Sequence, residues 1–364
     1  MVKRTNYLYV KEYLKYREEV EQISPSSLGR YWSYLRHLLL WADETLFSFV
    51  HKIRPTFTVY VSELVNPSNN QSLAWTTKKK IIETARHFFK WLKDSSPTKF
   101  KSTTKQLIDT LRPPRCAQNV GEHEFVSLKE VIHLINVSNP ETNLAMQRDK
   151  AAAAMLYLSG MRATAFTTLP ICGVDLASKS IRQWPELGVE TKNGKKATTY
   201  LLPIPELLAV VKEWDDLVRK ELPLDARWYA PILSEWGEQS LSLNAPGKNR
   251  SQALGKRLRL LFDAAGIKYR SPHKFRHGNA VYGLQHAVTM ADYKAVSMNL
   301  MHNDIKTTDS IYARLLSDDV GQRIAGLTDS STAQPDTEIV EIFKSMSNDQ
   351  LLQIIQHALT DVTP

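Results

Sequence analysis

Cysteine is scarce in this chain. Only Cys116 and Cys172 occur among its 364 residues, and neither belongs to a Cys-x-x-Cys pair. Two isolated cysteines cannot build a disulfide framework or a zinc site made of thiolates. We therefore expect both to be inert packing residues.

Long apolar runs are also missing. The longest uncharged apolar stretch, from Ala151 to Leu158, is far shorter than the ~20 residues that cross a bilayer. The basic start of the chain is followed by alternating polar and aromatic residues, without the apolar core of a signal peptide. The sequence therefore predicts a cytoplasmic protein with no membrane partner.

Acidic residues are scarce in the first third alone. Residues 1–115 hold 20 lysines and arginines against 10 aspartates and glutamates, whereas the remainder holds 27 against 28. A basic module beside a nearly neutral one suits a polyanion, because each neutralised phosphate releases bound counterions. A solubilising surface charge is the simpler alternative. The chain is about twice as long as a typical domain of ~150 residues, so two domains are expected.

Residues 1–110 are predicted to form a small all-helical domain. Their apolar residues recur at helical spacing, and β-type alternation is hard to find. Ser24 is a good N-cap, and Pro25 suits the first position of a helix. The expected helices span residues 7–20, the segment opening at Ser24, and residues 56–64 and 76–92.

Beyond a linker at 111–120, residues 121–328 are predicted to form a second, mostly helical domain with one small antiparallel sheet. Two prolines make the linker extended. The expected helices begin at Ser127 and span 143–158, 205–221, 251–265, 273–286 and 290–301; the strands span 180–184 and 198–202. An Asn-Gly pair marks the turn between the strands. Residues 329–364 are expected to form a tail with an amphipathic helix. The predicted fold class is mainly α.

Five short stretches in the second domain could serve one reaction. They are Ser159-Gly-Met-Arg162, Lys192, His273-Lys-Phe-Arg276, Leu300-Met-His302 and Ser310-Ile-Tyr312. Transfer of a phosphodiester to a hydroxyl needs a nucleophile, positive groups on the phosphate oxygens and an acid for the leaving oxygen. Two arginines, a lysine, two histidines and a tyrosine supply these roles without a metal. Taken singly, each stretch has a plain alternative, such as a helix cap, a solvated turn or a core aromatic.

The order and spacing of these stretches resemble the tyrosine recombinase (phage integrase-like) family. The matching text is S-G-M-R, T-K-N-G-K, S-P-H-K-F-R-H, L-M-H-N-D-I-K-T-T and S-I-Y-A-R-L, and Tyr312 follows His302 by ten residues. Two positions depart from the family pattern. Ala165 replaces an acidic residue, and Met301 replaces a glycine.

The resemblance implies a role for each of these residues. Those expected to bind and polarise the scissile phosphate are Arg162, His273, Arg276 and His302. Lys192 would be the general acid, with Lys195 and Lys196 as alternatives because turn registers are easily misread. Tyr312 would attack to give a 3′-phosphotyrosyl enzyme and a free 5′ hydroxyl. No cofactor is expected.

The resemblance also implies the partners. The basic helical domain would be the core-binding domain, which would close a clamp on double-stranded DNA with backbone contacts from Arg30, Lys79, Arg86 and Lys90. The active form would be a homotetramer on DNA, built from monomers in free solution. The tail helix would cap its own domain or dock on a neighbouring subunit.

The function expected from the sequence is site-specific DNA recombination. A type IB topoisomerase would share the chemistry without needing a particular site. A DNA-binding regulator would keep the fold without the reaction, although the complete set of six residues speaks against decay. A metal-dependent nuclease is disfavoured, because no carboxylate cluster accompanies the histidines in the sequence.

Overall fold

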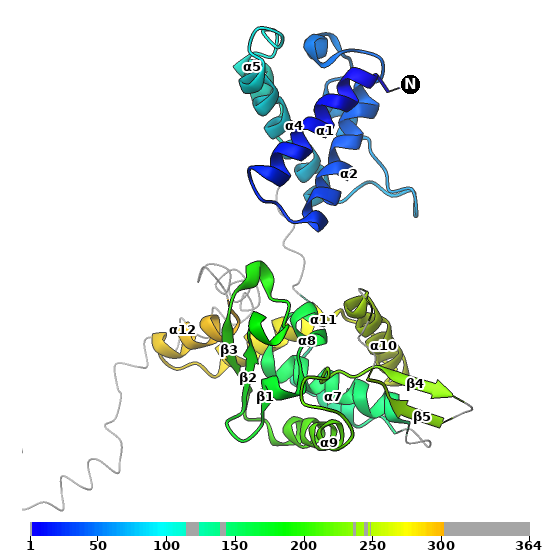
Figure 1. The fold of residues 1–364 in the computed structure, drawn as a ribbon, viewed down its shortest axis with the longest axis vertical. Helices are drawn as coiled ribbons and strands as arrows, with labels where there is room; N and C mark the ends of the chain where they lie inside the picture. Colours follow the sequence, from blue (N-terminus) through cyan, green and yellow to red (C-terminus); the bar gives the residue numbers. More distant parts are fainter. Residues whose placement is uncertain are drawn as a thin grey trace, which may run out of the picture. The chain divides into compact units, whose positions relative to one another are not determined.

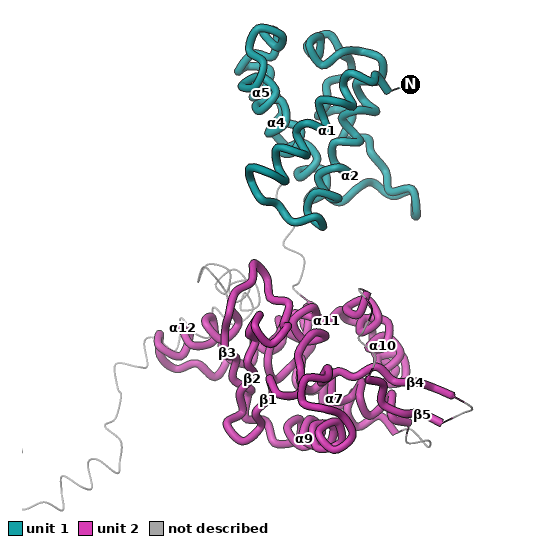
Figure 2. The backbone as a smooth tube through the Cα atoms, viewed as in Figure 1, with its two compact units in different colours: residues 1–119 teal, residues 120–364 magenta. Residues whose placement is uncertain are grey.

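Two units, Met1–Asn119 and Val120–Pro364, make up the chain in the computed structural model (Figure 2). The structure describes residues 2–113, 124–138, 143–235, 238–243, 247 and 249–301. Each unit has a hydrophobic core of its own, as expected of a unit that can hold its fold alone.

The first unit is a bundle of helices. They are α1 (Arg4–Glu19), α2 (Pro25–Ala42), α3 (Phe57–Ser62), α4 (Trp75–Ser95) and α5 (Lys105–Thr110), with a 3-10 helix over Phe47–Lys52 (Figure 1). Ser24 is the N-cap of α2 and Pro25 its first residue, as predicted. The longest helix, α4, packs against α1, α2 and α3 and buries one side of its length in the core of the unit.

The second unit is built around α7, the helix that leads to the first arginine. Its helices are α6 (Leu128–Ile135), α7 (Leu144–Ser159), α8 (Ala163–Thr167), α9 (Pro205–Glu221), α10 (Arg250–Ala264), α11 (Pro272–Gln285) and α12 (Met290–Asn299). Four of them, α6, α9, α10 and α11, pack against α7. The predicted helix at 205–221 is α9 in full, and a capping box of Ser127 and Glu130 opens α6 as predicted.

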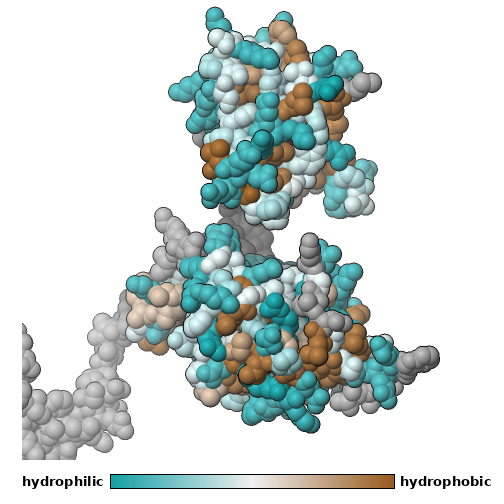
Figure 3. Space-filling view, in the orientation of Figure 1, coloured by the Kyte–Doolittle hydropathy of each residue, from teal (hydrophilic) through white to brown (hydrophobic). Residues whose placement is uncertain are grey.

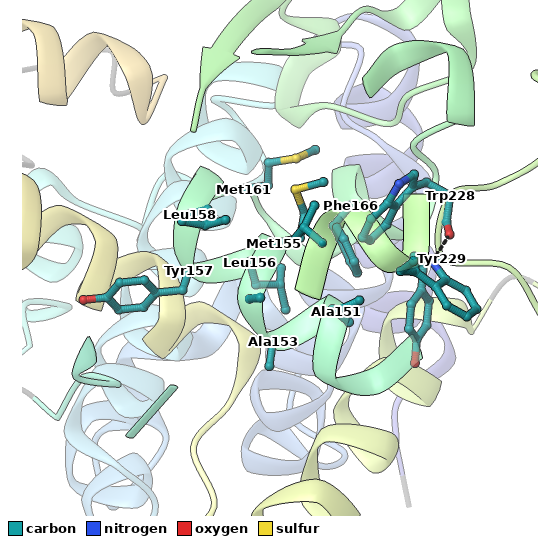
Figure 4. Close-up of a cluster of buried hydrophobic side chains, with 14 of the residues drawn as sticks. Ala151, Ala153, Met155, Leu156, Tyr157, Leu158, Met161, Phe166, Trp228 and Tyr229 are labelled. Carbon is teal, nitrogen blue, oxygen red and sulfur yellow. Dashed lines mark hydrogen bonds between the residues drawn. The ribbon is translucent and has the colours of Figure 1, made fainter. Parts of the chain in front are cut away.

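Burial around α7 is complete along its second half. Every residue from Ala151 to Ser159 is buried, which explains why small alanines occupy so much of this helix. Figure 4 shows Met155 and Phe166 on the side of Trp228, whereas Tyr157 points the other way. Its ring packs edge-to-face against Tyr282 of α11, with the ring centroids 6.4 Å apart. α7 is therefore held from opposite sides.

Two small antiparallel sheets accompany the helices. Strands β1 (Val174–Asp175), β2 (Ser180–Gln183) and β3 (Ala197–Tyr200) form the first, in that order, and β4 (Ile232–Glu235) pairs with β5 (Glu238–Leu241) in the second. The prediction of one sheet is wrong in number. β4 and β5 are short, polar and largely exposed, so they lack the apolar alternation that would reveal them. The predicted fold class is confirmed.

Hydrophilic side chains cover much of the face shown in Figure 3, with hydrophobic side chains scattered among them. Within the described residues, none of the helices has the length and apolar character needed to cross a membrane.

Candidate active site

The first arginine follows a sharp turn at the end of α7. Gly160 ends this helix in a left-handed conformation with φ 60°, which favours glycine. A Cβ atom at this position would also lie 2.8 Å from Oδ1 of Asn279. Two residues later, Arg162 is the N-cap of α8, with its side chain half-buried. The turn at Gly160 therefore determines the position of the Arg162 backbone.

The second arginine lies on α11. Pro272 opens this helix, so His273 and Arg276 share one face of its first turns. Arg276 is only 4% exposed. Its Nη1 donates to the carbonyl of Gly160 at 2.7 Å, and its Nη2 donates to the carbonyl of Leu300. One guanidinium thus joins the turn before Arg162 to the end of α12, and these two bonds use two of its five N–H donors.

Arg162, Arg276 and His273 lie within electrostatic reach of one another. Burial lowers the pKa of Arg276 to about 9, helped by repulsion from Arg162. Burial also lowers the pKa of Arg162 itself. Burial, followed by Arg276 and Arg162, lowers the pKa of His273 below 6.5. No carboxylate among the described residues contributes to these shifts, so the cluster holds positive charge that a bound anion would neutralise.

The candidate lysines lie between β2 and β3. Lys192 opens a short 3-10 turn, and the following Asn-Gly pair has positive φ at both residues, as the predicted turn requires. Lys192 is exposed, and its ammonium has no hydrogen-bond or ion-pair partner in the described part of the chain. Lys196 is occupied, because its Nζ lies 3.0 Å from Glu186 and 4.3 Å from the ring centroid of Trp184. Lys195 lines a pocket beside α12.

His302 and Tyr312 lie outside the described residues. The description ends at Met301, which is buried and has a φ of 53°. Three of the six predicted residues, Arg162, His273 and Arg276, are therefore brought together, and the places of Lys192, His302 and Tyr312 around them stay predictions.

Arg30 and Lys90, two candidate DNA contacts of the first unit, each line a pocket. Arg30 and Lys80 lie in one of about 270 Å³ between α2 and α4. Lys90 lies with Trp91 in another of about 520 Å³ between α1 and α4. His87 lines both pockets, so the two adjoin along α4. This surface combines cationic groups with aromatic rings, as nucleic-acid surfaces do, although Glu83 also lines the first pocket and Asp94 the second.

The other two candidates, Lys79 and Arg86, have acidic partners. Lys79 lies 3.8 Å from Glu83, and Arg86 lies 3.2 Å from Asp109 of α5. A phosphate would compete with these carboxylates, so Lys79 and Arg86 are the weaker candidates.

Comparison with known proteins identifies the family. Residues 124–318, more than half of the chain, match the model of the phage integrase family. This chain belongs to the phage integrase family. The tyrosine recombinase XerD of Vibrio vulnificus is 24% identical over 327 residues, which cover 88% of this chain and 95% of that protein. XerD of Ralstonia nicotianae is 28% identical over 284 residues, covering 76% and 80%.

Solved structures show the same fold. A lambda integrase dimer bound to a COC′ core site matches with a TM-score of 0.56 and 12% identity, over 84% of this chain and 76% of that one. The XerH recombinase bound to difH substrate matches with a TM-score of 0.53 and 16% identity, over 90% and 84%. Family membership and the XerD relatives identify an enzyme of the tyrosine site-specific recombinase class.

One departure from the phage integrase pattern affects the site directly. Ala165, where an acidic residue was expected, is 2% exposed and has no group that could bond an arginine. Arg162 makes no hydrogen bond or ion pair with any residue that the structure describes. Its position therefore depends on the backbone that carries it.

Sequence reasoning missed two residues of α11. His277 packs its ring against His273 with the centroids 4.6 Å apart. Asn279 donates to two carbonyls at the end of α7. Asn279 could have been suspected from sequence, because it lies three residues after Arg276 and thus on the same face of the helix.

Proposed function

We propose that this protein cuts and rejoins DNA at a specific site through a 3′-phosphotyrosyl intermediate, with Tyr312 as the nucleophile. The observation that carries the proposal is the meeting of the buried Arg276 with the half-buried Arg162 and the more exposed His273, without a neighbouring carboxylate among the described residues. Such a cluster is unfavourable when empty. A phosphodiester neutralises it, and charge grows on the non-bridging oxygens as the reaction proceeds.

Each step of the reaction needs two proton transfers. The Tyr312 hydroxyl gives its proton to solvent water and its oxygen attacks phosphorus, while the bond from phosphorus to the 5′ oxygen breaks. Lys192 gives a proton to that leaving oxygen. A 5′ hydroxyl from a partner strand then returns a proton to Lys192 and attacks the phosphotyrosine, and the released Tyr312 oxygen takes up a proton from water. The two arginines, His273 and His302 hold the phosphate throughout.

Among the lysines, Lys192 suits the acid role best. Lys196 would first have to leave Glu186 and Trp184. Lys192 has no such partner within the described residues, so its ammonium is free to turn towards a bound phosphate.

The first unit would supply most of the contacts to the DNA backbone. Arg30 and Lys90 line adjoining pockets of α4 that also hold Glu83 and Asp94, whereas Lys79 and Arg86 lie within ion-pair distance of Glu83 and Asp109. We propose that the active assembly on DNA is a homotetramer. A lambda integrase tetramer bound to a Holliday junction shares the fold. We also propose that the tail helix within residues 329–364 is exchanged between the subunits of this tetramer. These residues lie outside the described part of the chain.

The test traps the intermediate. The protein is incubated in EDTA with duplexes that carry a nick and random flanking sequence, so that a short 5′-hydroxyl fragment diffuses away after cleavage. Wild type should become covalently attached to DNA through a denaturant-resistant bond, and Tyr312→Phe should not. An adduct formed by Tyr312→Phe would exclude Tyr312 as the nucleophile.

The recovered DNA separates the alternatives. A shared sequence indicates a site-specific recombinase, a covalent product without sequence preference indicates a topoisomerase, and binding without any adduct indicates a regulator. A substrate with sulfur in place of the leaving 5′ oxygen tests the acid, because a thiolate leaves without protonation. Lys192→Ala should lose cleavage of the substrate with the 5′ oxygen and retain cleavage of the substrate with the 5′ sulfur.

A further inference from the structure

The side chain of Asn279 lies where α7 turns towards Arg162. It is 3% exposed and comes from α11, one helical turn beyond Arg276. Its Nδ2 donates to the carbonyl of Tyr157 at 2.8 Å and to the carbonyl of Leu158 at 3.0 Å. Both of its amide hydrogens are thereby used on consecutive peptide units of α7.

The Tyr157 carbonyl needs an outside donor, whereas the Leu158 carbonyl also accepts from the backbone amide of Leu202 at 3.0 Å. The last four carbonyls of a helix have no partner within it, and a buried one without a donor is costly. In an unbroken helix, the Tyr157 carbonyl would accept from the amide of Met161. Here the chain turns at Gly160, and the amide of Met161 donates instead to the Ser159 hydroxyl. Asn279 replaces the bond that the turn removes.

The same side chain also limits the shape of the turn. Oδ1 of Asn279 lies so close to Gly160 that a Cβ atom there would approach it to 2.8 Å. Arg276, on the same face of α11, holds the carbonyl of Gly160 itself. Asn279 and Arg276 thus hold the carbonyls of Tyr157, Leu158 and Gly160, in the segment that delivers Arg162. Arg276 also belongs to the proposed phosphate site of Arg162, Arg276 and His273, whereas the Asn279 amide is directed at α7.

Among the residues that the structure describes, no side chain bonds Arg162 to fix it. Ala165 lacks an acidic group, and Arg162 forms no hydrogen bond or ion pair within the described residues. We propose that Asn279 is a positioning residue for Arg162: it caps the end of α7 and so holds the first arginine where it meets the scissile phosphate. This inference rests on the proposed function. It assigns to α11 the task of placing both arginines.

The test replaces the amide by an apolar group of similar size. The substrate is the nicked duplex to which wild type attaches in the trapping experiment. At saturating protein, Asn279→Leu should cleave it about 10- to 100-fold more slowly, because small misplacements of a catalytic group slow a reaction by this order. DNA affinity should change little. Asp215→Asn is the matched control. Asp215 is also buried, on α9, and accepts bonds from Trp228 and Arg219, away from the turn. It should lower the melting temperature and leave the cleavage rate of the folded protein unchanged.

A double-mutant cycle distinguishes positioning from a general loss of stability. If Asn279 acts through Arg162, Asn279→Leu should slow an Arg162→Ala protein by a much smaller factor than it slows wild type. Equal factors in the two backgrounds, or a wild-type rate for Asn279→Leu, would overturn the inference.

Hydrogen exchange on the free protein needs no DNA. Asn279→Leu should speed exchange in peptides spanning residues 157–163, and exchange in α9 should stay as in wild type. Unchanged exchange at 157–163 would refute the inference even if wild type cleaves DNA. Failure of wild type to form an adduct would refute the proposed function and leave the exchange result to decide on Asn279.

Discussion

At the scale of single residues, the charge of His273 should report whether a phosphate occupies the proposed site of Arg162, Arg276 and His273. Burial and the two arginines lower the pKa of His273 below 6.5, so its ring is neutral at pH 7 and can donate a hydrogen bond without adding a third positive charge. A bound phosphate offsets the arginines, so it should raise this pKa. NMR titration of the ring protons, with and without inorganic phosphate, measures the change.

Two variants of the same proposed site serve as controls. His273→Gln identifies the resonance, and Arg162→Ala should raise the pKa of His273 in the absence of phosphate, because it removes one repelling charge. The sign for stability follows from the same shift. The unfolded chain binds this proton more tightly, so the contribution of His273 to stability is complete above about pH 6.5 and is lost as the pH falls through the lowered pKa. If phosphate leaves the pKa of His273 unchanged, the result would contradict the proposed phosphate site.

Sequence predicted which residues would meet, but not what surrounds them. The motif spacing predicted one site for Arg162, His273 and Arg276, and the structure brings these three together; their roles stay predictions. It could not find the bonds from Asn279 to α7, because these depend on the distance between helices that are more than 100 residues apart in sequence. Nor could it pair Lys196 with Glu186 across the loop.

At the scale of elements, α11 is fixed from the side of the segment that enters the second unit. The backbone of Val126 donates to the carbonyl of Lys274 at 3.1 Å, and Glu130 pairs with Arg270 just before the helix. Gly278 allows this approach, since a Cβ atom there would overlap the carbonyl oxygen of Val126. The helix that carries His273 and Arg276 therefore packs against residues 124–127.

Gly278→Ala should push these two segments apart. We expect it to lower the free energy of unfolding by about 1–3 kcal/mol, as overpacked cores do, and to slow DNA cleavage because α11 shifts. Gly255→Ala is the control, since its Cβ in α10 would meet only the hydroxyl of Tyr269 at 3.4 Å. It should gain about 0.5–1 kcal/mol from helix propensity. Urea unfolding of both variants decides. Equal stabilities would mean that Val126 does not lie against α11 as described.

Element prediction succeeded where periodicity was strong. α9 and α2 match their predicted starts, because Pro205 and Pro25 mark the first residue of each helix. β4 and β5 were missed because polar, exposed strands carry no burial signal, and α8 was missed because five residues are too few to show a period.

At the scale of the whole molecule, the excess of positive charge lies within residues 1–115, whereas the proposed reacting groups belong to the second unit. Arg162 and Arg276 would neutralise one phosphate, and exposed cations of the first unit would neutralise others along the duplex. Affinity and chemistry should therefore depend on different units. A variant of the first unit should weaken binding without changing the cleavage rate of the bound complex.

Salt dependence of DNA binding tests this division. Arg30→Ala and Lys90→Ala should each weaken binding to a random-sequence duplex and lower the slope of log affinity against log salt by about 1, because each removes one phosphate contact. Lys15→Ala is the control, an exposed lysine of α1 that lies 3.6 Å from Glu19. Fluorescence anisotropy across a salt series measures the slopes. If Lys15→Ala changes the slope as much as Arg30→Ala does, the salt dependence would reflect the net charge of the unit. The pockets along α4 would then not be the DNA-binding surface.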